Sequence, residues 1–308
     1  TDMDISILSS IDAEVLLPGE VSVSAHVLHD IIKKLPSGLS VEIFCENTNK
    51  LQIVCDKSSF SIPIIESDWF QDIAETNNFD SEFEISSSIM IELLSKTKFA
   101  MSLEDTRSHL NGVHLSARGG VLDGVATDCN RLSYVNFSDI TNLPNFGITI
   151  PRKTVTEIYK LLNDNKKSII IKLSDKKILF GYENNLLVSK LIDSAFPNYE
   201  EAIPQNNNKI MKVDAALLAN AIDRVSVVIS DRVKAIRFSL TKNQLQLSAI
   251  SHDSSDAKEL LEVLYEFDEE LEVSLNARYI LDVLNEVKGM CEISFSDRLS
   301  GIKISDLS

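Results

Sequence analysis

The sequence predicts an α+β fold of three tandem repeats, each built from two helices on antiparallel sheets. Three segments align with one another and begin at Val21, Ile148 and Val273, which are 127 and 125 residues apart. Each reads as a short alternating strand, a polar or proline helix start, and a helix with apolar residues at i, i+3, i+4 and i+7. Similarity at a fixed period indicates repeated structural units.

The segments around these helices repeat as well. Short alternating runs at 41–44 and 51–55 follow the first helix, and comparable pairs at 169–173 and 178–180, and at 291–295 and 301–304, follow the other two. Such pairs predict β-hairpins. A second class of helix precedes the later two copies, over 88–102 and 214–230, and the two ends are 128 residues apart. One unit is therefore expected to run helix, strands, helix, strands.

The repeat spacing predicts domain boundaries after residues 81 and 208, which gives units 1–81, 82–208 and 209–308. The run Asn206-Asn207-Asn208 suits a connecting segment at the second boundary. By comparison with the middle copy, roughly 45 residues of the first unit are expected ahead of residue 1. The last unit is likewise expected to lack its C-terminal tail.

Composition limits the class of protein. Hydrophobic residues make up 44% of the chain and charged residues 25%, as is usual for a globular protein with packed cores. No apolar run approaches the ~18 residues of a membrane span, and two acids stand among the first four residues, where a signal peptide carries bases. We therefore expect a soluble cytoplasmic protein with no membrane partner. The four scattered cysteines favour free thiols.

Nothing in the sequence calls for catalysis, a metal or a cofactor. His26 and His29 are spaced i, i+3 but have no third ligand at a suitable spacing, and neither glycine-rich nucleotide fingerprint occurs. Cys129 has His109 and His114 nearby in sequence, so a hydrolase with a cysteine nucleophile stays open as an alternative, without a nucleophile signature to support it.

The net charge is −16, which by itself argues against nucleic acid because phosphates are neutralised by Lys and Arg. Net charge does not say where the bases lie, however, and bases recur on the predicted helices of every unit. Ordinary exposed helix charges would give the same pattern; if equivalent helices line one surface, however, these bases form a strip that tracks phosphates without reading sequence. The predicted DNA-facing residues are Lys33, Lys34, Lys96, Arg152, Lys153, Arg224 and Arg278; Lys98, Lys160 and Lys288 belong to the same pattern.

Several runs of residues resemble the bacterial DNA polymerase III beta-subunit (sliding clamp) family. One is Ala126-Thr127-Asp128-Cys129-Asn130-Arg131-Leu132, and others lie at 99–102, 107–113, 150–153, 196–204 and 276–284. They follow one another in the family's order and spacing over essentially the whole chain. The resemblance implies a non-catalytic processivity factor for DNA polymerase: a head-to-tail homodimer closed into a ring around duplex DNA, with helices lining the hole.

The resemblance also implies an apolar pocket between the second and third units for a short peptide of the polymerase III alpha subunit, the clamp-loader delta subunit, or other polymerases and repair proteins. The residues that match the family's pocket are Arg107, Leu110, Thr127, Cys129, Asn130, Arg131, Leu132, Pro197, Ala202, Ile203 and Gly301. An apolar cleft with a few polar groups suits an extended peptide anchored by Leu or Phe.

The pocket departs from the family pattern in several places. Cys129 and Asn130 stand where the family has Gly and His, and Ala202 replaces a larger branched residue. Ser108 and His109 stand where the family has tyrosines. The family's C-terminal tail is also absent from the chain. The changes at Cys129 and Asn130 are expected to alter the shape of the pocket mouth, and the smaller Ala202 to deepen its floor. The loss of the tyrosines at Ser108 and His109 bears on DNA contact at that point.

For the subunit interface, the resemblance implies contact between Phe60 and Ile62 of one copy and Val227 and Val228 of the other. Apolar residues of this kind are also compatible with an ordinary core position. A scaffold built from repeats that binds proteins and has no DNA role is a further alternative.

Overall fold

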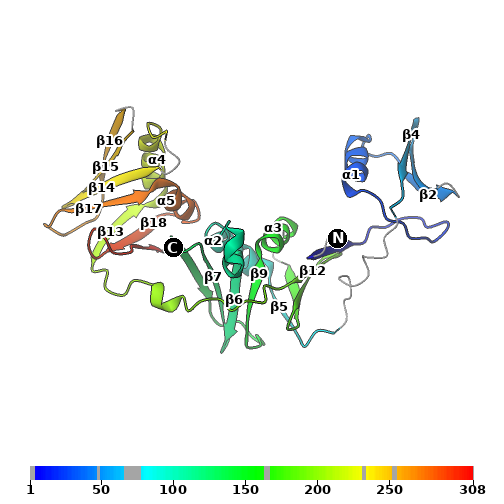
Figure 1. Cartoon of the computed structure of the whole chain (residues 1–308), viewed down its shortest axis with the longest axis horizontal. Coiled ribbons are helices and arrows are strands. Elements are labelled where there is room, and N and C mark those ends of the chain that lie inside the picture. The colour runs from blue at the N-terminus through cyan, green and yellow to red at the C-terminus, as the bar shows by residue number, and fades with distance from the viewer. Residues whose placement is uncertain are drawn as a thin grey trace.

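The computed structural model describes residues 4–46, 49–65, 78–162, 167–230, 234–251 and 255–307. Figure 1 shows three lobes that follow one another along an arc. Separate hydrophobic clusters occupy the three lobes, and we call these lobes the first, middle and third units. The domain boundaries after residues 81 and 208 stay predictions.

The first unit has one sheet and one helix among its described residues. The sheet has the order β2-β3-β4, with β2 at Glu42–Glu46, β3 at Lys50–Cys55 and β4 at Ser58–Pro63. Helix α1 (Ala25–Lys34) has no buried residue, and the core consists of Leu51, Ile53 and Ile62. Large apolar side chains of α1 and β2 are exposed in consequence, among them Val27, Ile32, Ile43 and Phe44.

The middle unit contains two sheets and two helices. Its five-stranded sheet has the order β1-β12-β11-β10-β5, and its four-stranded sheet has the order β8-β7-β6-β9. The first sheet consists of β1 (Ile5–Ser9), β12 (Asn185–Lys190), β11 (Lys177–Tyr182), β10 (Ser168–Leu173) and β5 (Ser81–Ser86); the second of β8 (Leu132–Phe137), β7 (Val121–Thr127), β6 (Gly112–Arg118) and β9 (Phe146–Pro151). The N-terminal strand β1 thus pairs with β12 and ties the start of the chain to the middle unit.

The third unit repeats this plan. One sheet has the order β16-β15-β14-β17 and the other the order β13-β18-β19. The strands are β16 (Asp256–Glu262), β15 (Gln244–Ile250), β14 (Ala235–Thr241), β17 (Leu271–Asn276), β13 (Lys209–Asp214), β18 (Met290–Phe295) and β19 (Lys303–Asp306). All strand pairs within the described sheets are antiparallel.

The helices repeat at the predicted spacing. Helices α1, α3 (Arg152–Leu161) and α5 (Ala277–Leu284) begin 127 and 125 residues apart, while α2 (Ser87–Lys98) and α4 (Ala215–Ser226) begin 128 apart. Each helix from α2 to α5 starts directly after a strand. Polar caps mark three of these starts, since Ser86, Asp214 and Asn276 accept hydrogen bonds from first-turn N–H groups. Helices α2 and α4 end four residues earlier than expected, where the chain closes with tighter bonds such as Ala100 N–H to the Thr97 carbonyl.

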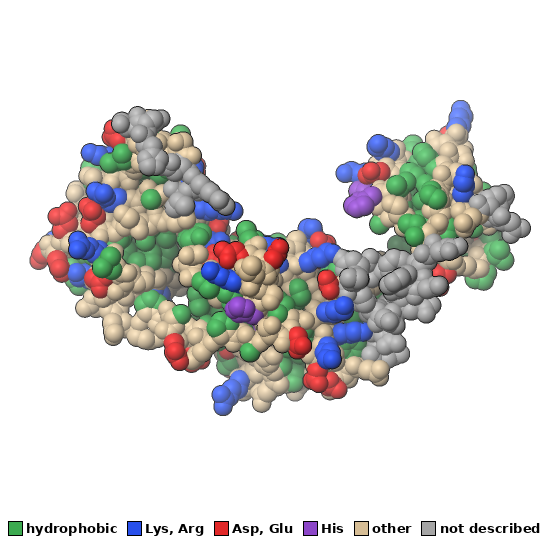
Figure 2. All heavy atoms as spheres, viewed as in Figure 1, with side chains coloured by type: hydrophobic (Ala, Val, Ile, Leu, Met, Phe, Trp, Pro, Cys, Tyr) green, Lys and Arg blue, Asp and Glu red, His purple; other side chains and the backbone are tan. Residues whose placement is uncertain are grey.

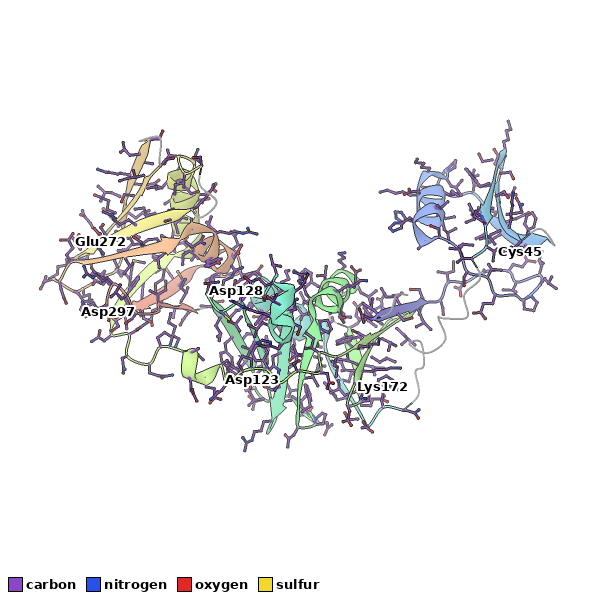
Figure 3. The ribbon with its side chains drawn as sticks, in the orientation of Figure 1. Cys45, Asp123, Asp128, Lys172, Glu272 and Asp297 are labelled. Carbon is purple, nitrogen blue, oxygen red and sulfur yellow. The ribbon has the colours of Figure 1, made fainter. Side chains whose placement is uncertain are left out.

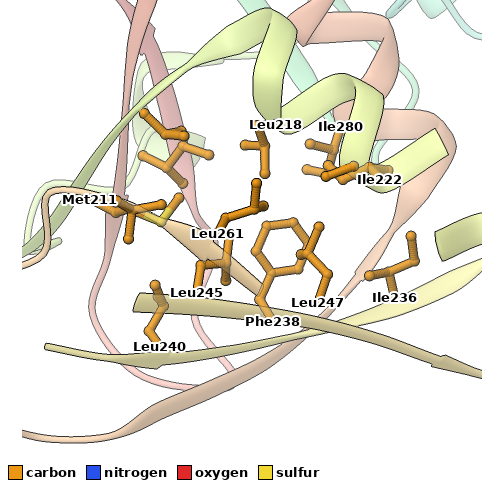
Figure 4. Packing of buried hydrophobic residues seen from close by; sticks show 14 of the residues in the cluster. Met211, Leu218, Ile222, Ile236, Phe238, Leu240, Leu245, Leu247, Leu261 and Ile280 are labelled. Atoms are coloured by element: carbon orange, nitrogen blue, oxygen red, sulfur yellow. The ribbon is translucent and has the colours of Figure 1, made fainter. Parts of the chain in front are cut away.

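The helices pack by their apolar stripes onto the sheets. In the third unit, Phe238, Leu245 and Leu247 of the sheet meet Leu218 on α4 and Ile280 on α5 (Figure 4). In the middle unit, α2 lies so close to β7 that a Cβ atom at Gly124 would stand 2.7 Å from Cδ2 of Leu93. Close packing of this kind fixes each helix on one face of its sheets.

This packing gives the arc two different sides. In Figure 1 the helices of all three units border the inner, concave side, whereas the strands lie toward the outside. The α+β fold of three repeated units, shaped as half of a ring, is confirmed. None of the described helices is long and apolar enough to cross a membrane.

Candidate functional site

The predicted DNA-facing residues all lie on helices of the inner side. Lys33 and Lys34 stand in the last turn of α1, and Lys96 in the last turn of α2. Arg152 and Lys153 open α3, Arg224 lies in the last turn of α4, and Arg278 in the first turn of α5. Figure 2 shows Lys and Arg side chains along the inner edge of each lobe, with acidic side chains among them.

These cations differ in how they are paired. The Lys96 ammonium lies 3.0 Å from Glu92 and 3.1 Å from Asp306. Partial burial alone would lower the pKa of Lys96, but the hydrogen bonds to both carboxylates outweigh it and raise the pKa. Arg224 forms a fork with Glu259, with Nε 3.1 Å from Oε2, and this hydrogen bond lowers the pKa of the Glu259 carboxyl.

The cations of the other helices are more open. Lys33, Lys34, Lys153 and Arg278 have exposed side chains. Lys98 instead lies over the ring of Tyr159, 3.3 Å from its centroid, and so joins α2 to α3. The inner side therefore offers exposed cations on α1, α3 and α5, while Lys96 of α2 and Arg224 of α4 are paired with neighbouring acids.

The predicted peptide pocket begins with the tight turn between β7 and β8. Asp128 Oδ1 accepts the N–H groups of Asn130 at 2.9 Å and Arg131 at 3.0 Å. Thr127 Oγ1 donates to the Arg131 carbonyl and accepts the N–H of Cys129. Cys129 itself has φ 72°, a conformation that favours glycine. These bonds fix the shape of the turn, and Figure 3 shows Asp128 near the third unit.

Two further predicted pocket residues lie on the short 3-10 helix η1 (Asp105–Leu110). Arg107 donates from Nη1 to the Asp128 carbonyl at 3.3 Å, so it lies directly against the turn. Leu110, in contrast, is 2% exposed and belongs to the interior of the middle unit. Leu132, the first residue of β8, is half-buried.

The remaining predicted pocket residues form a second group. Pro197, Ala202 and Ile203 lie in the segment 191–208 that connects the middle and third units, around the short 3-10 helix η2 (Glu200–Ala202). Gly301 lies beside this segment, because its carbonyl accepts a hydrogen bond from Asn207 at 2.9 Å. Both groups border the junction between the middle and third units.

Aromatic rings hold the connecting segment against the middle unit. The Phe196 ring stacks on His114 of β6 with centroids 4.7 Å apart, and Tyr199 lies against Tyr134 of β8. Tyr134 donates its hydroxyl to Asp123 at 2.8 Å, and partial burial together with this hydrogen bond raises the pKa of Tyr134 to about 12. Burial also lowers the pKa of His114.

The predicted interface residues differ in exposure. Val227, just after α4, is 76% exposed, whereas Ile62 is 6% exposed in the first unit's core. Phe60 and Val228 are half-buried and pack against the cores of their own units. Among these four, Val227 has the side chain most open to a second molecule.

The cysteine hydrolase gains no support from the geometry. Cys129 is an exposed free cysteine, and its backbone N–H donates a hydrogen bond to Thr127 Oγ1 within the turn. His114, one of the two candidate bases, is bonded to Thr149 at 3.1 Å. Within the described ranges no group of three or more His, Cys, Asp or Glu could hold a metal.

An open hollow of about 580 Å³ lies elsewhere on the middle unit, beside β5 and β10. Its lining includes Glu82, Glu84 and Ile170. None of the predicted pocket residues lines it, so it is not the pocket that the sequence predicts.

Comparison with known proteins agrees with the repeat. Family models for the N-terminal, central and C-terminal domains of the DNA polymerase III beta subunit match residues 1–74, 84–198 and 200–308. The chain belongs to the DNA polymerase III beta-subunit family. It is a processivity clamp of DNA replication and is not itself an enzyme.

Individual relatives cover almost the whole chain. The beta sliding clamp of Caulobacter vibrioides is 32% identical over 315 residues, which is 99% of this chain and 84% of the relative. A sliding clamp from Bartonella birtlesii, solved with griselimycin bound, is 31% identical with a TM-score of 0.92, over 100% of this chain and 84% of that one. The clamp of Pseudomonas aeruginosa is 28% identical with a TM-score of 0.92 and the same coverage.

Sequence reasoning missed the contacts that join the sliding clamp's middle and third units. Arg131 was expected only as a pocket wall, yet it bonds to Asp282 on α5, which lies 151 residues away in the chain. Lys96 was expected only as a DNA contact, yet it pairs with Asp306 on β19. A local pattern can predict the Asp128–Arg131 pair at i, i+3, but no spacing predicts partners this distant.

Proposed function

We propose that two copies of this chain close head-to-tail into a ring that encircles duplex DNA without sequence specificity. The observation that carries the proposal is the placement of helices and their bases on the inner side of an arc. Bases on helices can contact phosphates without reading base edges, so the ring is free to slide. The net charge of −16 is compatible with this function because net charge does not determine where the bases lie, and bases recur on the helices of the inner side.

Ring closure is supported by two sheet edges. Strand β4 ends the first unit's sheet and β16 ends one sheet of the third unit, and neither outer edge is paired within the described residues. Edge strands present unpaired backbone groups that can pair with another chain. A contact that joins unlike ends of two copies is heterologous. It gives a closed ring when the rotation that relates one copy to the next leads back to the first copy. Phe60 on β4 would then lie closest to Val227 and Val228 of the other copy, with Ile62 behind it in the first unit's core.

The experiment that tests the ring compares two DNA topologies. Clamp is loaded by a bacterial clamp loader onto a nicked circle, and half of the sample is then linearised. We expect clamp to stay on the circle at high salt and to leave the linear duplex, because topology rather than contact energy retains it. Equal loss from both forms would exclude encirclement.

The same experiment separates the ring from a scaffold with no DNA role. Replacing Arg152 and Lys153 with Gln removes two positive charges at the start of α3. We expect slower loading and faster loss from circular DNA, since nonspecific binding depends on phosphate neutralisation. Unchanged loading and retention would favour the scaffold.

We also propose that the junction between the middle and third units binds an extended peptide of partner proteins. The turn around Asp128, the connecting segment near Ile203, and Gly301 supply a border of apolar and polar groups for such a peptide. The polymerase III alpha subunit, the clamp-loader delta subunit and other polymerases or repair proteins are the proposed partners, in the cytoplasm where replication takes place. Griselimycin, which the relative from Bartonella birtlesii binds, is a convenient probe of this site.

A further inference from the structure

We propose that Arg131, with help from Lys96, locks the middle and third units at a fixed angle and so sets the width of the peptide pocket. Arg131 then acts as a positioning residue for this pocket. The inference about the pocket rests on the proposed function, whereas the lock itself can be measured without any ligand.

The guanidinium of Arg131 reaches three separate elements. Nε donates to Asp128 Oδ2 at 3.2 Å, within its own turn. Nη1 donates to Asp282 Oδ2 at 2.6 Å on α5 of the third unit, and Nη2 donates to the carbonyl of Phe99 at the end of α2. Every nitrogen of the side chain is thus bonded to protein, and one of the three bonds crosses the junction.

Ring contacts extend the same link. The guanidinium carbon lies 4.5 Å from the centroid of Tyr279 on α5 and 5.5 Å from that of Phe99. A guanidinium combines stacking with forked hydrogen bonds, which a lysine cannot do. Arg131 is therefore held between one aromatic ring of each unit while it bonds to carboxylates of both.

Burial makes this link strong. The side chains of Arg131 and Asp128 are each 17% exposed, and that of Asp282 is 30% exposed. A charge that is largely removed from water is costly when its partner is lost. Opening the junction would separate Arg131 from Asp282 and leave both charges only partly compensated.

Lys96 supplies a second point of attachment. Its ammonium bonds to Asp306 on β19, 3.1 Å away, and the side chains are 27% and 20% exposed. One contact would still permit rotation about it, whereas two contacts from different elements restrict both opening and twisting. Units joined by a small interface move relative to each other by default, so these pairs determine the angle at the junction.

The link reaches the pocket through the turn itself. The Asp128 carboxylate that holds Arg131 Nε also accepts the backbone N–H groups of Asn130 and Arg131. Movement of α5 is therefore transmitted to the turn that forms one border of the pocket. The other border, near Gly301, belongs to the third unit, so the width of the pocket follows the angle between the units.

The lock is tested by a distance measurement on the full chain. Spin labels at Arg118→Cys on the middle unit and Glu270→Cys on the third unit report the angle, in a background with Cys45→Ser and Cys129→Gly. We expect one narrow distance distribution for the parent and broader distributions for Arg131→Gln and Asp282→Asn. The double variant should be no broader than either single variant, because both break the same link. Narrow distributions in both single variants would overturn the lock.

Griselimycin affinity separates positioning from direct contact. If Arg131 positions the pocket, Asp282→Asn weakens binding about as much as Arg131→Gln, by about tenfold, and the effects do not add. If Arg131 instead touches the ligand, Arg131→Gln weakens binding and Asp282→Asn leaves it unchanged, which overturns the positioning role. Failure of the parent itself to bind griselimycin counts against the pocket, while the distances still decide the lock.

Lys242→Gln is the matched control, because it removes an ion pair with Asp268 that lies within the third unit and far from the junction in sequence. It should leave both the distances and the affinity unchanged. Thermal unfolding checks that each variant is folded. Tyr279→Leu is a second variant that weakens the hold on Arg131, because it removes the ring on which the guanidinium lies and keeps an apolar side chain. A broadened distribution in Lys242→Gln would assign the effect to general charge loss and overturn the lock.

Discussion

The imidazole of His114 stacks on the ring of Phe196, with centroids 4.7 Å apart and ring planes 12° apart. His114 belongs to β6, whereas Phe196 belongs to the segment that leads from the middle unit to the third. The stack therefore fastens a connecting segment, part of the proposed pocket, to a rigid sheet. The protonation state of one histidine bears directly on that attachment.

Stability is expected to fall as the pH drops below about 6.5, the ordinary pKa of histidine. Burial lowers the pKa of His114 in the folded chain, and Asp123 only partly offsets this. The unfolded chain takes up the proton first, so the contribution of His114 is complete above pH 6.5 and is lost as pH falls through the lower folded-state pKa. Urea unfolding at pH 7.5, 6.5 and 5.5 measures the change.

The variant His114→Gln is the control for this pH dependence. It should reduce the loss of stability between pH 6.5 and 5.5. Carboxyls such as Glu259 and Asp297 have lowered pKa values and contribute only at more acidic pH. An equally steep loss in His114→Gln would show that another group is responsible.

Cys129 occupies a backbone conformation that suits glycine. With φ 72°, a residue with a Cβ atom carries strain of roughly 1–2 kcal/mol, partly offset by the greater freedom of glycine in the unfolded chain. We expect Cys129→Gly to raise the free energy of unfolding by no more than about 1 kcal/mol. Cys129→Val, with a branched side chain, should be less stable than the parent by about 1 kcal/mol or more. Equal stability of the two variants would contradict the strain.

Gly112 is required by the pairing of β6 with β9. A Cβ atom there would collide with the carbonyl oxygen of Ile150, which is backbone and cannot move aside without distorting the strand. Gly112→Ala is expected to cost about 2–3 kcal/mol of unfolding free energy. Gly147→Ala on the same pair of strands is the control, since its nearest neighbour, His114 Cε1, would be 3.9 Å away. Chemical denaturation measures the free energy of unfolding of both variants, and Gly112→Ala should be clearly the less stable.

The inner cations are expected to contribute unequally to DNA binding. Replacing Lys33 and Lys34 with Gln should reduce the slope of log affinity against log salt by about 1 per residue. Lys96→Gln should change the slope much less, because Glu92 and Asp306 already neutralise its charge. Binding to a short linear duplex at several salt concentrations gives the slopes. A larger change from Lys96→Gln would mean that its ion pairs open on DNA.

Dimer formation is expected to depend on Val227 more than on Ile62. Val227→Glu places a charge on a side chain that is 76% exposed, so it should weaken the dimer by about tenfold or more and leave monomer stability unchanged. Ile62→Ala should instead destabilise the first unit by about 2–4 kcal/mol, because Ile62 is 6% exposed in its core. Sedimentation and urea unfolding distinguish the two effects, and an intact dimer in Val227→Glu would exclude this interface.

The sequence by itself determined the repeat, the α+β class and the family, because apolar spacing and turn residues are local signals that recur in each copy. It predicted Arg152 and Arg278 at helix starts for the same reason. Only the tertiary structure decided that Ile62 is core and Val227 is surface, and that Arg131 and Lys96 bond across a junction to Asp282 and Asp306. Those pairings join elements 151 and 210 residues apart. Nothing in their local sequence encodes them, because they arise from the angle at which two separately packed units meet.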